Sequence, residues 1–319
     1  MNGKNYTKNV SVTVNQFKTA KDYVVANVEV TYPDGNVWVP EGFRISTDSA
    51  STVQGGIVIE DKDLNQFVWV PVATIAAYKR TAYSTNVATT ETDTATNSIK
   101  INLSSSKNSD YFTEALPEDE KTSVERYKGF YIGRYEAGDK ESTVAKTLRS
   151  SNDVTKTVTI KANQAPYNYV KMAQAVSLAE GFATKQGYKA KTKLVSSYAW
   201  DTTIAFMQKV NSDYGSSSEE GNYIDTKFSY TDITGAKQTK AKNSNVLVPT
   251  GQTTPVCNIY DMGGNVWELT TESYSNTYIP CAIRGGYYSN SFADFPAGFR
   301  YSNSDYAYDR IGFRLTLFM

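Results

Sequence analysis

The beginning of the chain alternates between polar and apolar positions at the spacing of short β-strands. The alternation is clear at residues 10–14 and 24–31, and the Pro-Asp-Gly-Asn sequence at 33–36 is a strong turn signal. We therefore expect a small β segment or β module over residues 1–54, suited to attaching the rest of the chain to a larger assembly.

Two continuous apolar runs follow at residues 56–60 and 67–72, and their length predicts a buried hairpin. The residues between them begin with the Asp-x-Asp-x-Asn spacing of a calcium loop. However, Gln66 stands where such a loop has glycine, and Val72 stands where it has glutamate. A plain turn is therefore the favoured interpretation.

The middle of the chain combines a polar stretch with an aromatic strand. Residues 84–110 are rich in Thr, Ser and Asn and have few large apolar side chains, so we expect a loop on the surface. Residues 127–136 carry aromatic side chains at alternate positions, which predicts a strand.

Two helices are predicted from apolar positions at helical spacing. The stripe of the first helix consists of Met172, Ala175, Val176, Ala179, Phe182 and Ala183. The second helix begins after Ser196 and Ser197, both suitable N-caps, and carries Trp200, Ile204 and Met207 on one face. Beyond this helix the pattern indicates short strands and long loops. The expected fold class is α+β.

Composition narrows the chemistry that the chain can perform. It has no histidine, which removes the commonest general base near neutral pH and the commonest transition-metal ligand. It has 24 tyrosines, and tyrosine supplies the stiff, amphipathic contact area that binding surfaces favour. Ordinary strand positions account for part of this tyrosine content. The remainder indicates recognition.

Charge and hydropathy argue against two classes of partner. The chain carries 33 basic and 33 acidic side chains without a long run of either sign, so we expect no nucleic-acid partner. No stretch has the length and apolarity of a membrane span or a signal-peptide core, so neither membrane insertion nor signal-dependent secretion is expected. A protein borne on a particle and released by lysis fits the same sequence.

The most specific motif is Tyr-Asp-Met-Gly-Gly-Asn-Val-Trp-Glu-Leu at residues 260–269. Ile-Arg-Gly-Gly follows at 283–286 and Ile-Gly-Phe-Arg at 311–314. This order resembles the signature of the formylglycine-generating-enzyme, or sulfatase-modifying-factor, family, which has a variant of the C-type lectin fold. Shorter matches precede it in the same order, at 67–72, 130–136 and 194–200. The resemblance implies one C-type-lectin-type domain over about residues 55–319.

The residues of this signature indicate structural roles. Gly264 and Asn265 suit a tight turn with positive φ, Trp267 is expected to anchor the core, and Glu268 is expected to accept backbone hydrogen bonds. A phosphate cradle is the alternative for the glycines, but they neither open a predicted helix nor carry the lysine that such a loop needs. The expected structural residues are Gly264, Asn265, Trp267, Glu268, Arg284, Gly285, Gly286, Gly312, Phe313 and Arg314.

The resemblance implies catalysis only where the copper ligands of the family are present. The enzymes hold copper with a cysteine pair shortly before the final Gly-Phe-Arg, and here the corresponding segment, 298–310, has no cysteine. The two cysteines of the chain, Cys257 and Cys281, flank the Gly-Asn-Val-Trp-Glu turn. We expect them to lie close together, as buried thiols or as a disulfide. Formylglycine generation is not expected, and a divergent copper enzyme is an alternative that requires this pair in an accessible pocket.

Residues 287–310 have a composition of their own. The segment is dense in Tyr, Asn, Ser, Asp and Phe and contains no Lys, Glu, Gln, Met or Trp. It resembles the variable region of diversity-generating retroelement proteins, in which randomised adenines convert Asn codons into codons for Tyr, Ser, Asp, Phe, Ala and few others. Those codons never specify the five absent residue types.

A surface of this composition combines aromatic area with adaptable hydrogen bonding, as antibody paratopes do. The expected contact residues are Tyr287, Tyr288, Asn290, Phe292, Asp294, Phe295, Tyr301, Asn303, Asp305, Tyr306, Tyr308 and Asp309. The alternative is that these residues form ordinary strands and an exposed loop of a domain that does not vary.

These observations predict a non-catalytic binding protein whose partner is a protein or a glycan on a host or target cell surface. Phage virions and bacterial surfaces are the expected locations. A fixed lectin-like glycan-binding or structural module is the alternative. No cofactor is expected; calcium is compatible with the long loops, but no ligand cluster is specific enough to name.

Overall fold

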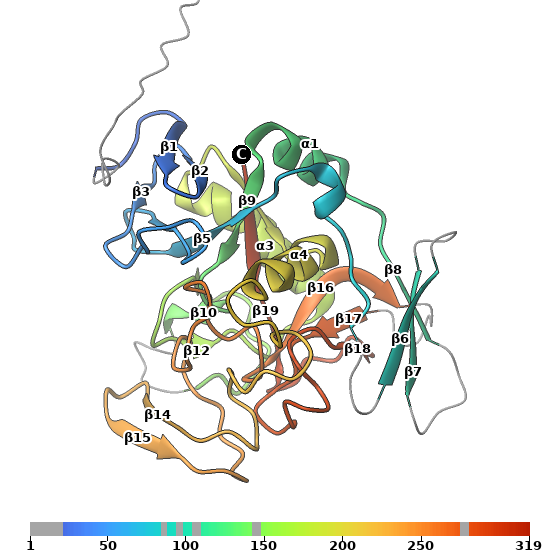
Figure 1. The fold of residues 1–319 in the computed structure, drawn as a ribbon. Helices are drawn as coiled ribbons and strands as arrows, with labels where there is room; N and C mark the ends of the chain where they lie inside the picture. Colours follow the sequence, from blue (N-terminus) through green and yellow to red (C-terminus); the bar gives the residue numbers. More distant parts are fainter. Residues whose placement is uncertain (1–21, 84–87, 94–97, 104–109, 142–147, 275–280) are drawn as a thin grey trace, which may run out of the picture.

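The computed structural model describes residues 22–83, 88–93, 98–103, 110–141, 148–274 and 281–319 (Figure 1). The chain folds as an α+β structure with many short strands. Helices in the described part include α1 (Glu118–Tyr127), α3 (Met172–Gln186), α4 (Ser197–Met207) and the short 3-10 helix η1 (Ile75–Ala77). None of the described helices combines the length and apolarity needed to cross a membrane.

A six-stranded sheet forms the centre of the molecule. Its order is β13-β20-β9-β5-β4-β3, and every neighbouring pair is antiparallel. The strands are β3 (Arg44–Ile45), β4 (Val58–Glu60), β5 (Gln66–Pro71), β9 (Gly129–Gly133), β13 (Lys191–Leu194) and β20 (Leu315–Phe318). The buried hairpin predicted over residues 56–72 is confirmed as β4 and β5.

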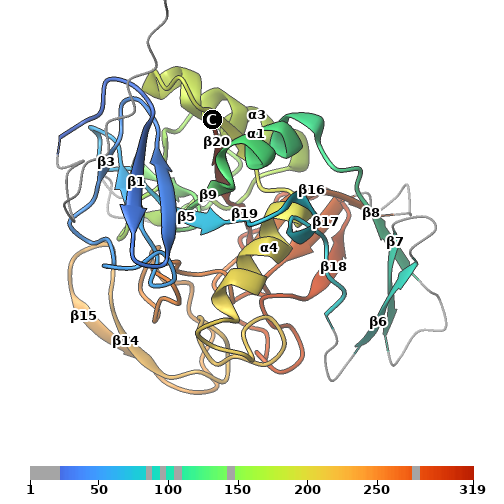
Figure 2. The ribbon, with the colours of Figure 1, turned by 45° about the horizontal axis from the view of Figure 1, so that its top comes forward.

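Hydrophobic clusters cover both faces of this sheet. Along β5, Phe67 and Trp69 belong to one cluster while Val68 and Val70 belong to the other, because successive side chains of a strand point to opposite faces. Helix α3 adds Phe182 to the first cluster and α4 adds residues to the second, so the two helices lie on opposite sides of β5 (Figure 2).

A second sheet carries the C-terminal motifs. Its order is β18-β17-β16-β8-β7-β6, and β19 pairs in parallel with β16. The strands are β6 (Ala88–Asp93), β7 (Ser98–Leu103), β8 (Asp110–Thr113), β16 (Trp267–Tyr274), β17 (Cys281–Arg284), β18 (Arg300–Asn303) and β19 (Ile311–Phe313). The surface segment expected at 84–110 contains a hairpin instead of only a loop, since β6 and β7 pair at the edge of this sheet (Figure 2).

Three smaller sheets are present in the described part of the chain. They are β1 (Val28–Tyr32) with β2 (Gly35–Val39), β10 (Gly138–Asp139) with β11 (Val158–Thr159) and β12 (Ala165–Pro166), and β14 (Phe228–Thr231) with β15 (Lys237–Lys240). The turn predicted at 33–36 is confirmed between β1 and β2. The strand predicted at 10–14 lies outside the described residues.

The described part of the N-terminal segment shares the core of the rest. Val37 and Phe43 belong to the same cluster as Trp69. In addition, β3, which precedes residue 54 in the sequence, pairs with β4, which follows it. The division of the chain after residue 54 stays a prediction.

Both predicted helices are confirmed, with changes in detail. The Ser196 hydroxyl caps α4 by accepting a hydrogen bond from the Ala199 amide at 3.1 Å, and Trp200, Ile204 and Met207 are fully buried as expected. The buried face of α3 consists of Ala175, Leu178, Ala179, Phe182 and Ala183. The predicted Met172 and Val176 lie at its margin, only partly buried.

Helix α1 was not among the two predicted helices. It carries three acidic residues in its first turn, which interact favourably with the helix dipole, and it ends at Lys128 in the left-handed conformation. Only Glu120, Ser123, Val124 and Tyr127 are buried along it. An apolar stripe of two side chains is too narrow for periodicity to reveal.

Candidate functional site

The 287–310 segment leaves β17, forms a loop, returns as the edge strand β18 and then forms a second loop that leads into β19. The loops lie at the same end of the molecule as the β14–β15 hairpin (Figure 1). The structure thus brings the predicted contact residues to one region, though not all to its surface.

The first loop is held to the fold through its main chain. The Tyr288 amide donates to the Asn265 carbonyl at 3.1 Å, and the Asn290 carbonyl accepts from the Ile224 amide at 2.9 Å. These two bonds involve no side-chain atom of the loop. Changing the side chain at 288 therefore leaves its main-chain bond in place.

The second loop is held in the same way. The Tyr308 carbonyl accepts from the Tyr169 amide at 3.0 Å, and the Asp309 carbonyl accepts from the Asn168 side-chain amide. Tyr169 and Asn168 lie outside the segment. The fixed part of the chain thus holds the position of this loop without using the side chains at 308 and 309.

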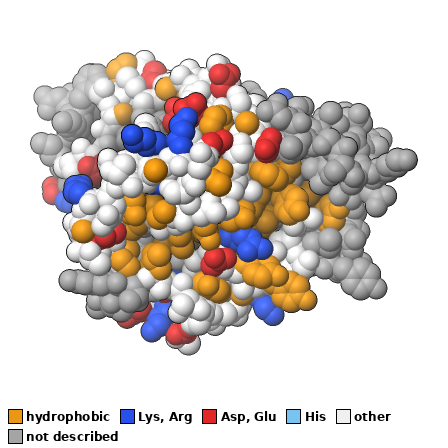
Figure 3. Space-filling view, turned by 90° about the horizontal axis from the view of Figure 1, so that it is seen from below, with side chains coloured by type: hydrophobic (Ala, Val, Ile, Leu, Met, Phe, Trp, Pro, Cys, Tyr) orange, Lys and Arg blue, Asp and Glu red, His pale blue; other side chains and the backbone are white. Residues whose placement is uncertain are grey.

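Three tyrosines of the segment are among the exposed large hydrophobic side chains of the described residues. Tyr301 is 41% exposed, Tyr306 58% and Tyr308 38%. The rings of Tyr306 and Tyr308 lie 5.9 Å apart, and the Arg310 guanidinium lies 4.5 Å from the Tyr308 ring centre. Figure 3 views this end of the molecule and shows hydrophobic side chains gathered in a band across it.

Tyr301 combines an exposed position with a supported ring. It stacks on Trp267 at 5.8 Å and on Phe299 at 6.3 Å, and both of these residues are buried. Phe295 packs edge-on against the same group. The expected core role of Trp267 is confirmed, and it also supports the exposed Tyr301 ring.

Tyr287 and Tyr288 are half-buried and pack edge to face at 5.2 Å. The Tyr288 hydroxyl donates to Asp309 at 2.8 Å, which joins the two loops. Burial and this carboxylate raise the pKa of Tyr288. Arg310 lies 5.7 Å from the Tyr287 ring centre. These residues form a connected polar and aromatic group beside the exposed tyrosines.

Other predicted contact residues are half-buried or buried, and two of them help to hold the segment in place. The Asn290 side chain accepts from the Tyr287 amide at 3.1 Å, and Phe292 packs edge-on against Tyr223. Asp294 is half-buried, and Asn303 is buried at 8% exposure, away from the accessible surface that was expected for it.

Asp305 caps a helix that is distant in sequence. Its Oδ1 accepts from the Met172 amide at the start of α3 at 2.7 Å, and its φ of 58° lies in the left-handed region. Lys171, the N-cap residue of α3, cannot accept at this position through its side chain. Asp305 therefore supplies the acceptor that this helix end needs.

Beneath this surface lies a network of buried charges. Asp201 binds both Arg284, at 2.5 Å, and Arg300. Glu272 binds Arg300 at 3.0 Å and Arg80 at 2.6 Å. Burial alone would raise the pKa of Glu272, but Arg300 and Arg80 lower it to about 2. The network keeps opposite charges in contact, which offsets their desolvation.

Two further signature residues pair with each other. Arg314 contacts Glu268 at 2.7 Å, and both are fully buried. Glu268 is predicted to accept backbone hydrogen bonds, but in the structure it accepts from the Arg314 guanidinium instead. Arg314 also donates to the Gly133 carbonyl at 2.8 Å. The pair therefore ties the second sheet to β9.

The turn at Gly264 and Asn265 has the positive φ values predicted for it, 73° and 56°. A Cβ on Gly264 would lie 2.3 Å from the Asn222 carbonyl oxygen, which only glycine avoids. The Asn265 side chain bonds Glu136 and both main-chain groups of Val248. The turn therefore connects residues that are distant in sequence, such as Glu136 and Val248, through hydrogen bonds.

The two cysteines form no disulfide and are buried thiols, one of the two expected alternatives. Both are free and buried, and Cys257 and Cys281 belong to different hydrophobic clusters. Burial raises the pKa of Cys257 to about 11 and that of Cys281 to about 12. Copper binding needs adjacent thiolates, so these residues do not fit the copper site of the resembled enzymes.

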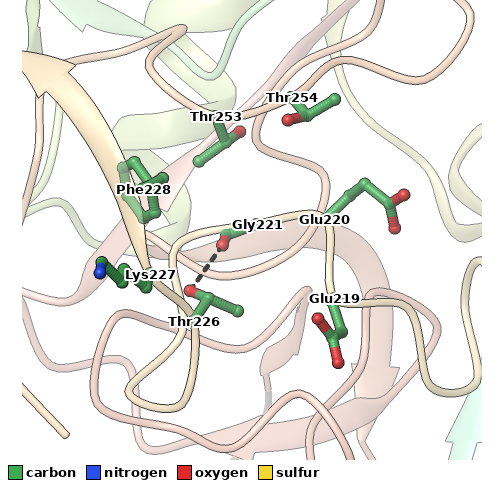
Figure 4. Close-up of a pocket in the computed structure, with 8 residues that line it drawn as sticks. All are labelled: Glu219, Glu220, Gly221, Thr226, Lys227, Phe228, Thr253 and Thr254. Carbon is green, nitrogen blue, oxygen red and sulfur yellow. Dashed lines mark hydrogen bonds between the residues drawn. The ribbon is translucent and has the colours of Figure 1, made fainter. Parts of the chain in front are cut away.

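A pocket of about 190 Å³ lies beside β14, lined by residues 219–221, 226–228 and 253–254 (Figure 4). The Thr226 hydroxyl donates to the Gly221 carbonyl at 3.0 Å across its wall. None of the predicted contact residues lines it. The predicted contact surface is therefore separate from this pocket.

A hollow of about 690 Å³ lies between β8, α1, β13 and β16. Glu114 in its wall accepts from the Ser197 amide at 2.9 Å. Burial, with a smaller contribution from Glu272, raises the pKa of Glu114 to about 8. Its hydrogen bond to the start of α4 gives this carboxyl a structural role.

Comparison with protein families gives one match. The model described as "Sulfatase-modifying factor enzyme 1-like domain" matches residues 10–317. Comparison with the curated proteins gives no match.

Solved structures with similarity to this chain include PvdO from Pseudomonas aeruginosa. It is 15% identical, with a TM-score of 0.44, and the match covers 82% of this chain and 98% of PvdO. Treponema denticola variable protein 1 is 12% identical with a TM-score of 0.38, covering 80% of this chain and 96% of that one. CarF is 14% identical with a TM-score of 0.39, covering 60% and 87%.

Proposed function

Because the chain belongs to the family of sulfatase-modifying factor enzyme 1-like domains, we propose that it uses a C-type-lectin-type scaffold of this family to bind a partner, without catalysis. The binding surface is the 287–310 segment. Its centre is formed by Tyr301, Tyr306 and Tyr308, with Tyr288 and Asp309 beside them.

The observation that carries this proposal is that both loops of the segment are anchored through main-chain atoms. Tyr288, Asn290, Tyr308 and Asp309 are each held by their own amide or carbonyl group. Such anchoring keeps a loop in position while its side chains change. A surface that varies needs this property, because the fold must persist through every variant.

The residue types support a protein or a glycan as the partner. Exposed tyrosine rings stack on apolar surfaces, and Asp309 and Arg310 at their border provide hydrogen bonds and charge. Display on a phage virion or a bacterial surface would present this face to a target cell, with residues 1–54 as the attachment.

The cysteines support the non-catalytic part of the proposal. A copper enzyme of this family needs two thiolates within reach of one metal ion. Cys257 and Cys281 are both buried and belong to different hydrophobic clusters. Copper titration with thiol counting on the folded protein tests this point. Stoichiometric, high-affinity Cu(I) binding would contradict it.

The experiment that tests the variable surface is to sequence the DNA around the gene. A near-copy of the 3′ end beside a reverse-transcriptase gene, with mismatches confined to adenines of the copy, is the expected result. The codons of Tyr301, Tyr306 and Tyr308 should be among the mismatched ones. Mismatches spread over all bases would overturn the proposal.

A fixed lectin-like module is the second candidate, and one observation favours it. Phe295, Asn303 and Asp305 lie within the segment, yet they pack the core or cap α3. A segment with such residues is also suited to a single constant surface. Absence of any near-copy of the gene's 3′ end would make this candidate the better account.

A further inference from the structure

Lys240, the last residue of β15, is a buried ammonium group. Only 1% of the residue is exposed, and among the described residues no carboxylate lies within ion-pair distance of it. Burial lowers its pKa, and the charge of Asp225 opposes this effect. A buried charge in this position requires other partners.

Those partners are carbonyl oxygens of one loop. The Lys240 ammonium donates to the Tyr223 carbonyl at 2.5 Å, to the Thr226 carbonyl at 2.8 Å and to the Ile224 carbonyl at 3.4 Å. The Phe228 ring lies 5.9 Å from the nitrogen. Three carbonyls converge on one positive charge, in the way that oxygen ligands are arranged around a bound cation. The Asn243 amide, at 2.7 Å from the Ile224 carbonyl, and the Thr226 hydroxyl also bond this loop, so Lys240 is one of several groups that hold residues 223–226.

The same loop contacts the first loop of the binding surface. The Ile224 amide donates to the Asn290 carbonyl at 2.9 Å. The Asp225 carboxylate accepts from the Ser291 hydroxyl at 2.9 Å and from the Phe292 amide at 3.4 Å. Residues 223–226 are therefore a brace, with carbonyls directed to Lys240 and an amide and a carboxylate directed to the 290–292 loop.

We propose that Lys240 is a positioning residue of the binding surface: its ammonium group acts as a built-in cation that orders the 223–226 brace and, through it, the 290–292 loop. This inference rests on the proposed function for its biological meaning. The ordering itself is a property of the chain without any partner, so it is tested separately.

The test is hydrogen exchange measured by mass spectrometry on the full chain, comparing Lys240→Met with Lys237→Met. Both lysines belong to β15, but Lys237 is exposed and donates to the Thr231 side chain. In Lys240→Met we expect the peptides over 222–228 and 288–295 to exchange about tenfold faster, with the core strand β16 unchanged, because local opening needs no global unfolding. Lys237→Met should match the wild type.

Two further variants separate positioning from general stability. Lys240→Gln keeps an N–H donor but not the charge, and its exchange rates should fall between those of wild type and Lys240→Met. Asp225→Asn weakens the contact to Ser291 and Phe292 and should speed exchange over 288–295 while 222–228 stays protected by Lys240.

The results that overturn the inference are distinct. Unchanged exchange in both peptides of Lys240→Met would show that the ammonium does not order the brace. Equal acceleration in β16 would show that Lys240 supports the whole fold. Neither result depends on a ligand, so a failure of the proposed function, seen in the DNA sequence, is distinguishable from a failure here.

Discussion

The charged network and the aromatic surface above it are built from neighbouring residues but are held in opposite ways. Arg300 is 2% exposed and contacts two carboxylates, whereas the next residue, Tyr301, is 41% exposed. The network depends on particular side chains at particular distances. The loops on either side of β18 are anchored by main-chain bonds, to which side chains such as Asn290 and Asp305 add contacts. Tolerance of substitution should therefore change sharply between adjacent positions of one strand.

The largest effect is expected at Asp201. In Asp201→Asn, Arg284 loses its carboxylate partner and Arg300 loses one of two, and breaking a buried ion pair costs about 3–5 kcal/mol. Urea unfolding followed by tryptophan fluorescence measures the loss. Asp294→Asn, at a half-buried aspartate of the surface, is the matched control. Equal stability of the two variants would contradict the distinction between network and surface.

Glu114 should give a pH-dependent effect. Its pKa is raised from 4.5 to about 8, so the folded state binds its proton more tightly than the unfolded state. The stability that comes from keeping this carboxyl protonated in the fold is fully present below pH 4.5 and is lost as the pH rises towards 8. Glu114→Gln should remove this loss, so its free energy of unfolding should exceed that of wild type by roughly 1–3 kcal/mol between pH 5 and 8.

Thermal or urea unfolding at several pH values tests this prediction. Glu118→Gln, which changes an exposed carboxyl at the start of α1, serves as the control. A difference between Glu114→Gln and wild type that stays constant with pH would show that Glu114 is already ionised in the fold.

A smaller loss of stability is expected at Asp305, a residue of the surface segment that caps helix α3. Asp305→Ala removes the acceptor at the start of α3 and should cost about 1 kcal/mol. Asp305→Asn should retain most of the stability, because asparagine accepts the same bond and tolerates positive φ. Urea unfolding compares both with Asp309→Ala. An equal effect of Asn and Ala at 305 would argue against capping.

The smallest effect is expected at the exposed tyrosines. Tyr306→Ala and Tyr308→Ala should each change the free energy of unfolding by less than about 0.5 kcal/mol, since surface substitutions leave the main-chain anchors intact. Tyr301→Ala should cost more, because its ring stacks on Trp267. If all three variants are equally destabilised, the surface is part of the core and is unsuited to variation.

The sequence permits prediction of elements whose signals are local. The hairpin at 56–72 and helix α4 with its Ser196 cap follow from short apolar runs and a capping residue. The strands β6 and β7 were missed because their threonines and serines read as loop residues in isolation. They form strands because β8 and β16 provide a sheet edge for them to extend.

Ion pairs and tertiary contacts of the site had no such local signal. Asp201 and Arg300 are 99 residues apart, and Arg80 and Glu272 are 192 apart. The cysteine pair was inferred from position along the chain, but the two thiols belong to different hydrophobic clusters. The 287–310 segment was proposed from composition alone, whereas the division between exposed and supporting residues within it depends on the fold.

The position of β20 has a consequence for the order in which the fold can be completed during synthesis. The strand lies between β13 and β9 within the six-stranded sheet, yet it is formed by residues 315–318, after the 287–310 segment. A chain truncated within that segment would lack this inner strand and Arg314, and we expect it not to complete its main sheet. The central sheet can therefore close only after the whole 287–310 segment has been synthesised.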